Sequence, residues 1–225
     1  TMGESLSLGT LLIDGGFSQT AAAMTSSHYC TAERQYRMPV PYGNQRAPTA
    51  QWTATASGCT ILGREGPGPY VTHVTRGKIV DKGIADTNNM GAAMAPAAYD
   101  TLSAFFRETK TSPKDFDRIF TGDLGELGHS IVLDWFRQDG VDLSANYFDC
   151  GLLLYDREKQ DMHAGASGCG CSAAVLNGYI LPQLRAGVWQ RVLFAPTGAL
   201  LSPVSSGQGE SIPGICHAVC LSVQR

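Results

Sequence analysis

The second half of the chain alternates helical patterns with short apolar segments, and this order restricts the fold more than any other feature. The helices predicted there cover 89–110, 125–139 and 167–184, and the strands cover 117–121, 146–155, 190–195 and 215–223. Strands that are apolar throughout are typically buried on both faces. Helices that alternate with such strands supply the cover. We therefore expect an α/β fold, with a mostly buried sheet between two layers of helices.

The first part of the chain predicts one helix, several short strands and a long loop. Residues 1–16 have helical spacing of leucines and end at a pair of glycines, but Thr1 offers neither a lead-in nor a cap. The strands predicted after this helix cover 20–24, 51–62 and 70–81. The loop 26–50 is rich in turn residues, and loops of this length in compact proteins are usually functional or interacting.

Composition excludes several classes of protein. Hydrophobic residues make up 43% and charged residues 16%, the net charge is -3, and no basic block occurs. Nucleic-acid binding through bulk charge is therefore not expected. No apolar run approaches the ~20 residues needed to cross a bilayer, and the N-terminus lacks the charged region of a signal peptide. We expect a soluble chain.

The seven cysteines show no disulfide spacing. Five of them stand among apolar or small residues and are expected to be buried, reduced packing residues: Cys30, Cys59, Cys150, Cys216 and Cys220. Reduced thiols indicate an intracellular compartment. Cys169 and Cys171 form CxC rather than CxxC, and no second cluster completes a zinc, iron–sulfur or redox site.

The segment 163–173 reads HAGASGCGCSA and runs into a predicted helix. Its glycines allow the backbone to approach a ligand closely, and the unpaired amides of a first helical turn favour an anion. His163 stands directly before this loop. Glycine turns before helices are common, and a lone histidine is more often a satisfied polar residue than a ligand. The residues alone leave both interpretations open.

Two further glycine-rich segments, 121–128 and 205–219, also adjoin predicted strands. In open α/β sheets, ligands bind outside the carboxyl ends of the strands. The three loops therefore predict a single cleft with several walls.

Read together, these loops resemble the thiolase and ketoacyl-synthase superfamily. MHAGASG (162–168) is similar to the GHPxGxSG loop with its activating histidine, GQG (207–209) is similar to the end of CxGGGQG, and residues 1–16 resemble the helix after the nucleophilic cysteine. The resemblance implies a layered αβαβα fold of two related βαβα halves. Residues 1–82 would be the remainder of the first half, lacking its N-terminal part, and 83–225 the second half. The nucleophilic cysteine would lie upstream of Thr1.

One branch of the superfamily is closer still. The segments that carry this likeness include TSSHYCTAERQYR, AQWT, NMGAAMAPAAYDTL, TGDLGELG, DCGLLLYD, QDMHAGASGCGCSA, TGALLSP and QGESIPGI. They resemble the stage V sporulation protein AD family. This implies that the chain binds dipicolinic acid (pyridine-2,6-dicarboxylate), either alone or as its calcium complex. It also implies that this binding serves sporulation and germination. It also implies a homodimer, peripheral at the spore inner membrane, beside membrane-embedded stage V sporulation A proteins.

Catalysis by this half of the fold is not expected. The acid/base cysteine of thiolases would fall on Pro203, which cannot transfer a proton, and the Asn or His of the middle loop near Gly122. Asp123 beside it would repel a developing oxyanion. Only His163 is kept. The alternatives are an acyl-CoA-dependent thiolase or ketoacyl-synthase-type acyltransferase with its nucleophile upstream, and a purely structural subunit on a membrane complex.

The resemblance and the loop pattern together predict the ligand contacts. Amides of 167–171, with the hydroxyls of Ser167 and Ser172, would receive one carboxylate, and His163 would hydrogen-bond the ligand. The predicted ligand-binding set is His163, Ser167, Gly168, Cys169, Gly170, Ser172, Asp123, Gly207 and Gln208. We expect no resident metal or cofactor, although Asp123 and Asp149 are candidates to hold calcium near the ligand. Arg34 and Arg37 are alternative anion contacts.

Overall fold

A computed structural model describes residues 1–31 and 46–225. The elements in chain order are α1 (Met2–Asp14), β1 (Thr20–Ser27), β2 (Trp52–Thr53), β3 (Ala56–Gly63), β4 (Tyr70–Arg76), α2 (Met90–Thr109), the 3-10 turn η2 (Pro113–Asp115), β5 (Arg118–Thr121), α3 (Gly125–Gln138), β6 (Tyr147–Asp149), α4 (Cys150–Leu153), β7 (Ala166–Ser167), α5 (Cys169–Val175), the π-helical turn η3 (Leu176–Ile180), α6 (Leu181–Arg185), β8 (Arg191–Ala195), β9 (Thr197–Ala199), α7 (Pro203–Gly207) and β10 (Gly214–Ser222).

The main sheet has the strand order β4-β10-β8-β5-β6, with β9 paired to β10. β5 runs parallel to both β6 and β8, whereas β10 is antiparallel to β8 and β4. β1 and β3 form a separate antiparallel hairpin. The short strands β2 and β7 pair in parallel, with Trp52 opposite Ala166. This last pairing joins the end of the long loop to the glycine-rich segment.

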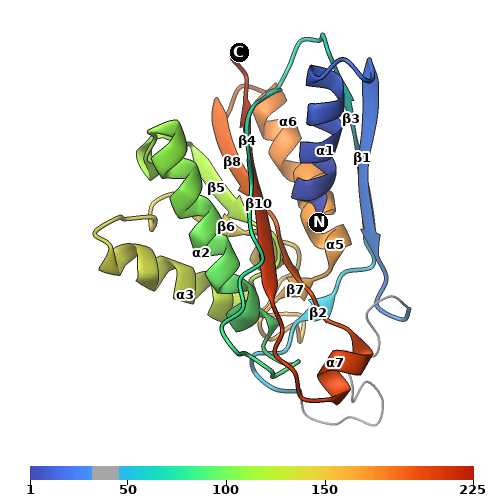
Figure 1. Cartoon of the computed structure of the whole chain (residues 1–225), viewed down its shortest axis with the longest axis vertical. Helices are drawn as coiled ribbons and strands as arrows, with labels where there is room; N and C mark the ends of the chain where they lie inside the picture. Colours follow the sequence, from blue (N-terminus) through green and yellow to red (C-terminus); the bar gives the residue numbers. More distant parts are fainter. Residues whose placement is uncertain (32–45) are drawn as a thin grey trace.

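The elements stack in alternating layers (Figure 1). α2 and α3 cover one face of the main sheet, α1, α5 and α6 cover the other, and the β1–β3 hairpin packs on the far side of α1 and α5. The first core is rich in rings, including Phe105, Phe116 and Phe136. The second is built around Phe120, Phe194 and aliphatic side chains of the α5–α6 region. The expected α/β fold with a sheet buried between helices is confirmed.

The predictions from periodicity were right for the long elements and wrong in two short ones. α2 and α3 begin and end within a residue or so of the predicted ranges. The strand predicted over 146–155 ends at Asp149, because the Asp149 side chain accepts a hydrogen bond from the Gly151 amide and begins α4. The strand predicted over 51–62 is two strands, because β2 pairs with β7 and β3 with β1.

The first helix was predicted correctly but its start and its buried face were not. Thr1 is itself the N-cap: its hydroxyl accepts from the Glu4 amide, and Glu4 reaches back to the Thr1 nitrogen. Leu8, Leu11 and Leu12 lie on the exposed side. The residues that α1 buries are Met2, Gly3, Leu6, Ser7, Gly9 and Ile13.

The prediction that five cysteines are buried packing residues holds for three of them. Cys150, Cys216 and Cys220 are buried, and burial raises the pKa of the Cys216 thiol to about 12. Cys30 and Cys59 are exposed, so the prediction was wrong for these two. Cys59 lies on β3, where alternate residues face outward. None of the seven cysteines forms a disulfide within the described residues.

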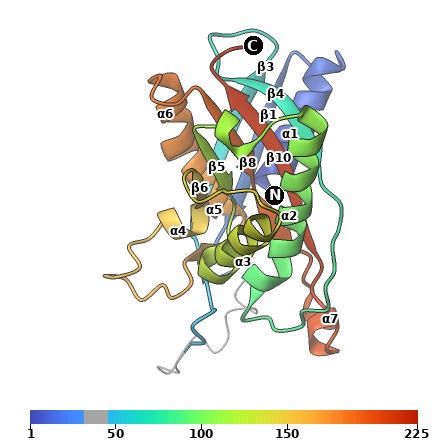
Figure 2. The same ribbon diagram turned by 90° about the vertical axis from the view of Figure 1, so that its left-hand side faces the viewer.

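α2 and α3 approach closely enough that only glycine fits at their contact. A Cβ on Gly91 would lie 2.3 Å from the Leu124 carbonyl oxygen and 3.0 Å from the Gly128 nitrogen. Figure 2 shows the two helices side by side in front of the sheet. This contact places the start of α3, and with it the loop that carries Asp123.

We predict that Gly91→Ala lowers the free energy of unfolding by about 1–3 kcal/mol, because the added methyl group overpacks a backbone contact. Gly178→Ala is the matched control, since a Cβ there meets nothing within 4 Å. The control is expected within about 1 kcal/mol of the parent chain. Urea unfolding curves measure both, and equal stabilities of the two variants would contradict the packing account.

His217 on β10 is a buried histidine whose surroundings disfavour its protonated form. Its Nδ1 accepts a hydrogen bond from the Gly77 amide at 3.3 Å, and its Nε2 has no hydrogen-bond partner among the described residues. Burial lowers the pKa of His217, against an opposing effect of Glu4. A proton on the ring would therefore disfavour the fold.

The unfolded chain takes up this proton at a pKa of about 6.5, above the pKa in the fold. The free energy of unfolding should therefore fall as the pH drops below that value. His217→Asn keeps an acceptor for Gly77 and does not titrate, so its stability should depend less on pH. Urea unfolding at pH 7.5 and 5.5 compares the two chains, and identical pH dependence would refute the prediction.

Candidate functional site

The carboxylate of Asp123 connects three loops at the carboxyl ends of the central strands. One oxygen accepts from the Ser167 hydroxyl at 3.2 Å and the Gly168 amide at 2.9 Å, and the other accepts from the Thr197 hydroxyl at 3.0 Å. The side chain is buried. The structure thus brings together three residues predicted for the site, Asp123, Ser167 and Gly168, but it does so through an internal carboxylate.

Asp149 also stabilises this region, because its carboxylate accepts hydrogen bonds from the end of β5, the start of α3 and the start of α4. Its two oxygens accept from the Thr121 hydroxyl at 2.7 Å and from the amides of Leu124, Gly125 and Gly151 at 3.0–3.1 Å. Burial raises the pKa of Asp149, against the effect of these hydrogen bonds. Within the described ranges, no group of three or more His, Cys, Asp or Glu side chains is arranged to hold a metal ion.

The amides of the glycine-rich loop mostly have partners within the chain. The Gly168 amide donates to Asp123, the Gly170 amide to the Ser27 hydroxyl at 2.9 Å, and the Cys171 amide to the Gly168 carbonyl. Ser172 is buried, whereas Cys169 is exposed. Binding of a ligand carboxylate by these amides stays a prediction. A ligand would have to displace these internal bonds or be held by other groups.

Such groups lie beside the same loop, around His163. His163 has a positive φ of 45°, and its Nδ1 lies 2.9 Å from the Ala47 carbonyl oxygen. Its Nε2 lies 2.8 Å from Oδ1 of Asp161. Both neighbours of the His163 ring are oxygen atoms that can accept a hydrogen bond.

Arg46 meets the same carboxylate from the other side. Its Nη2 lies 2.9 Å from Oδ2 of Asp161. Hydrogen bonding by Arg46 is the main cause that lowers the pKa of Asp161. The Arg46 guanidinium also lies over the Trp52 ring, 4.7 Å from its centroid, and Tyr29 stacks on Trp52 at 4.3 Å. We call Arg46 and His163, which converge on one carboxylate beside these rings, the Arg46–His163 pair.

Sequence reasoning singled out His163 but missed Arg46, Trp52 and Asp161. The long turn-rich loop was a signal that this region is functional, and Arg46 lies near the end of that loop. The sequence around Arg46 does not show which distant residues it contacts in the folded chain. Trp52 reaches the glycine-rich loop through the parallel pairing of β2 with β7, a contact between segments more than 100 residues apart. Arg34 and Arg37, the other predicted anion contacts, lie outside the described residues.

The third predicted loop stands apart from the other two. Gly207 and Gln208 are at the exposed end of α7, where the Gln208 amide donates to the Val204 carbonyl within the helix. Neither residue makes a hydrogen bond to 163–172 in the part of the chain that the structure describes. Pro203 is the first residue of α7. A role of Gly207 and Gln208 in ligand binding stays a prediction.

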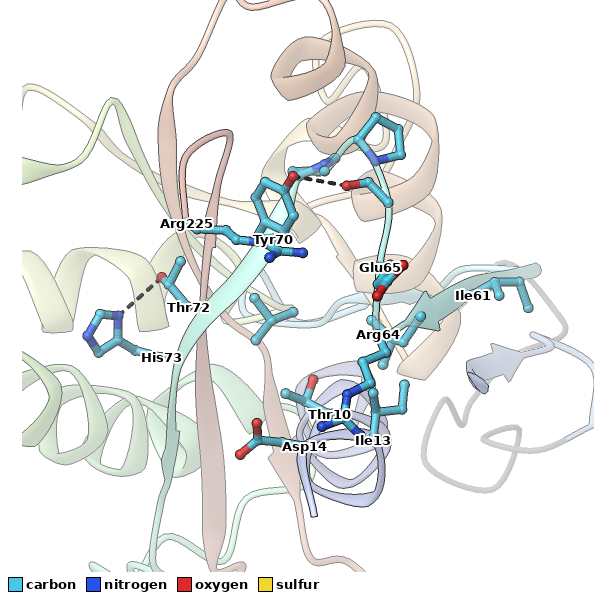
Figure 3. Close-up of a pocket in the computed structure, with 17 residues that line it drawn as sticks. Thr10, Ile13, Asp14, Ile61, Arg64, Glu65, Tyr70, Thr72, His73 and Arg225 are labelled. Carbon is cyan, nitrogen blue, oxygen red and sulfur yellow. Dashed lines mark hydrogen bonds between the residues drawn. The ribbon is translucent and has the colours of Figure 1, made fainter. Parts of the chain in front are cut away.

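A cavity of about 710 Å³ lies at the opposite end of the molecule, between the end of α1, the β3–β4 connection and β4 (Figure 3). Its lining includes Arg64 and Arg225 but also Asp14 and Glu65, so the charges balance. None of the residues predicted for the site lines it. The cavity is therefore not the cleft that the glycine-rich loops predict.

Comparison with known proteins decides the family. The model of the family described as "Stage V sporulation protein AD (SpoVAD)" matches residues 1–222. A curated relative, stage V sporulation protein AD of Bacillus subtilis (strain 168), is 45% identical over 216 residues. The chain belongs to the stage V sporulation protein AD family. That alignment covers 96% of this chain and 64% of the relative, so the chain spans less than two thirds of the relative's length.

Solved structures support the fold of this SpoVAD-family chain. AbyA1, a tetronic acid condensing enzyme, superposes with a TM-score of 0.59 at 13% identity, covering 98% of this chain and 65% of that protein. The 3-oxoacyl-[acyl-carrier-protein] synthase III of Aquifex aeolicus superposes with a TM-score of 0.53 at 9% identity, covering 97% and 63%. The expected thiolase and ketoacyl-synthase type of fold is confirmed. At these identities the likeness concerns the fold alone.

The hydrogen bonds of Asp123 predict a structural role that can be measured. Asp123→Asn places an NH₂ group against donors, so the free energy of unfolding should fall by about 1–3 kcal/mol. Asp134→Asn is the matched control, because Asp134 is an exposed partner of Arg137 on α3. It should change stability by less than about 0.5 kcal/mol. Urea unfolding of both variants tests this, and a fully stable Asp123→Asn chain would rule the role out.

Proposed function

We propose that this SpoVAD-family chain is a non-enzymatic binding protein for dipicolinic acid, acting in dipicolinate uptake during sporulation and release during germination. The observation that supports this most strongly is the Arg46–His163 pair, which already holds one carboxylate against an aromatic surface. Dipicolinate is a planar aromatic ring with two carboxylates. Its carboxylates suit the donors of the Arg46–His163 pair, and its ring suits the aromatic side chains beside them.

The groups around the pair suit such a ligand in charge and shape. A guanidinium binds a carboxylate through two parallel hydrogen bonds, and here Nη1 of Arg46 is buried without a hydrogen-bond partner among the described residues. His163 adds a second donor. Tyr29, stacked on Trp52, places an aromatic ring near the pair. A dianion taken out of water needs such compensating donors.

The same geometry argues against acyl transfer. Nε2 of His163, at the position of the activating histidine, faces the Asp161 carboxylate at 2.8 Å in this structure. The carboxylate of Asp123 lies against the loop where a condensing enzyme needs donors for an oxyanion. We propose that the fold has kept a pocket and lost its reaction.

The remaining parts of the proposal rest on family membership. The chain would act at the spore inner membrane as a peripheral protein, beside membrane-embedded stage V sporulation A proteins, and as a homodimer. No helix of the described residues is long and apolar enough to cross a membrane. Calcium would arrive as the dipicolinate complex rather than as a resident ion.

Calorimetric titration with dipicolinate, with and without calcium, tests the proposal. We expect saturable binding that weakens about ten- to hundredfold in Arg46→Gln and in His163→Gln, since each variant loses a hydrogen bond to a charged group. Arg157→Gln is the matched control, because Arg157 pairs with Glu126 and is not one of the two proposed ligand-binding side chains. Circular dichroism checks that each variant is folded.

Titration with acetyl-CoA separates the alternatives. The proposal expects no heat from acetyl-CoA. Binding of acetyl-CoA without binding of dipicolinate would instead favour the acyltransferase. If the folded chain bound neither compound, a purely structural subunit would be the better description.

A further inference from the structure

We infer that Asp161 is an internal competitor for the ligand: its carboxylate occupies the place on the Arg46–His163 pair that a ligand carboxylate takes, and it must leave before the ligand binds. This inference rests on the proposed function. It adds a residue that lowers the affinity for every carboxylate ligand of this site and that makes no contact with the bound ligand.

The contacts of Asp161 are those of a bound carboxylate. Its two oxygens are shared out, Oδ1 to His163 at 2.8 Å and Oδ2 to Arg46 at 2.9 Å. Its carbonyl oxygen also accepts from Arg46. No other acidic side chain of the described residues pairs with Arg46 or His163. The pair thus already binds the chemical group that we propose for the ligand.

Asp161 is also easy to remove from this place. Its side chain is 82% exposed, whereas the side chains of Arg46 and His163 are 17% and 23% exposed. A carboxylate that turns outward becomes hydrated at once, and exposed ion pairs are weak. The side chains of Arg46 and His163, by contrast, are mostly enclosed by the rest of the chain.

The partners of the pair do not depend on Asp161 for their positions. Arg46 lies against Trp52, which is fixed by Tyr29 and by pairing with β7. His163 is held by the Ala47 carbonyl oxygen. The turn before Asp161 is closed by its own hydrogen bonds, between Asp156 and Gln160. Rotation of the Asp161 side chain therefore opens a site that is already formed.

A ligand replaces Asp161 when its carboxylate makes more hydrogen bonds to Arg46 than the Asp161 carboxylate makes. Asp161 engages only one guanidinium nitrogen by its carboxylate and leaves Nη1 without a hydrogen-bond partner among the described residues. A ligand carboxylate can take both nitrogens. A tethered group competes at an effective concentration on the order of millimolar. Simple monocarboxylates therefore bind only weakly, whereas a ligand with a ring and a second carboxylate has further contacts that outweigh the competitor.

Removal of the competitor should raise affinity. We expect Asp161→Ala and Asp161→Asn to bind dipicolinate about three- to tenfold more tightly than the parent chain in calorimetry. Picolinate, which has one carboxylate, should gain by the same factor, because it displaces the same competitor. Asp134→Asn, which removes an exposed acid of the same kind on α3, should leave both affinities unchanged. Unchanged or weaker binding in the Asp161 variants would overturn the inference.

A second readout does not depend on dipicolinate. Formate, a bare carboxylate, is titrated into the parent chain and Asp161→Ala while the ring resonances of His163 are followed by NMR. The variant should respond at a formate concentration about three- to tenfold lower, the same factor as for dipicolinate. Absence of dipicolinate binding together with this formate response would reject the proposed function but retain the competitor. Equal formate responses would reject the competitor even if dipicolinate binds.

Discussion

The buried carboxylate of Asp123 is the interaction on which the functional end of the molecule depends. It hydrogen-bonds the loop that follows β5 to the start of α5 and to β9, segments that are 44–74 residues apart in sequence. Asp149 does the same for the turn into α3. Each carboxylate satisfies backbone amides that would otherwise be unpaired at the ends of strands and helices. Without them, the glycine-rich loops would have no fixed relation to one another.

This arrangement has a consequence for function. The Ser167 hydroxyl and the Gly168 amide, two donors of the glycine-rich loop, are committed to a carboxylate of the chain itself. The groups that remain for an external anion are the side chains of Arg46 and His163, which lie beside the glycine-rich loop. They too contact a carboxylate of the chain itself. The molecule is thus built twice around carboxylate recognition, once permanently at buried Asp123 and once exchangeably at exposed Asp161.

The sequence predicted what depends on neighbours along the chain. The helices α2 and α3 and the apolar strands β5, β8 and β10 follow from periodicity, and the superfamily from loop motifs. It did not predict α4, because the capping by Asp149 replaces an apolar strand pattern, nor the exposed Cys59, because that depends on which face of the hairpin is covered. Arg46 and Trp52 were missed for a similar reason: their meeting with His163 needs the β2–β7 pairing, which no local pattern specifies.

The central claim is that a dicarboxylate binds at the Arg46–His163 pair. The most direct measurement is an NMR titration with dipicolinate that follows the indole of Trp52 and the ring of His163, with His73 and Tyr70 at the opposite cavity as internal references. The account predicts that Trp52 and His163 shift together with one midpoint while the references stay fixed. Shifts confined to His73 and Tyr70 would place the ligand at the other end of the molecule and contradict it.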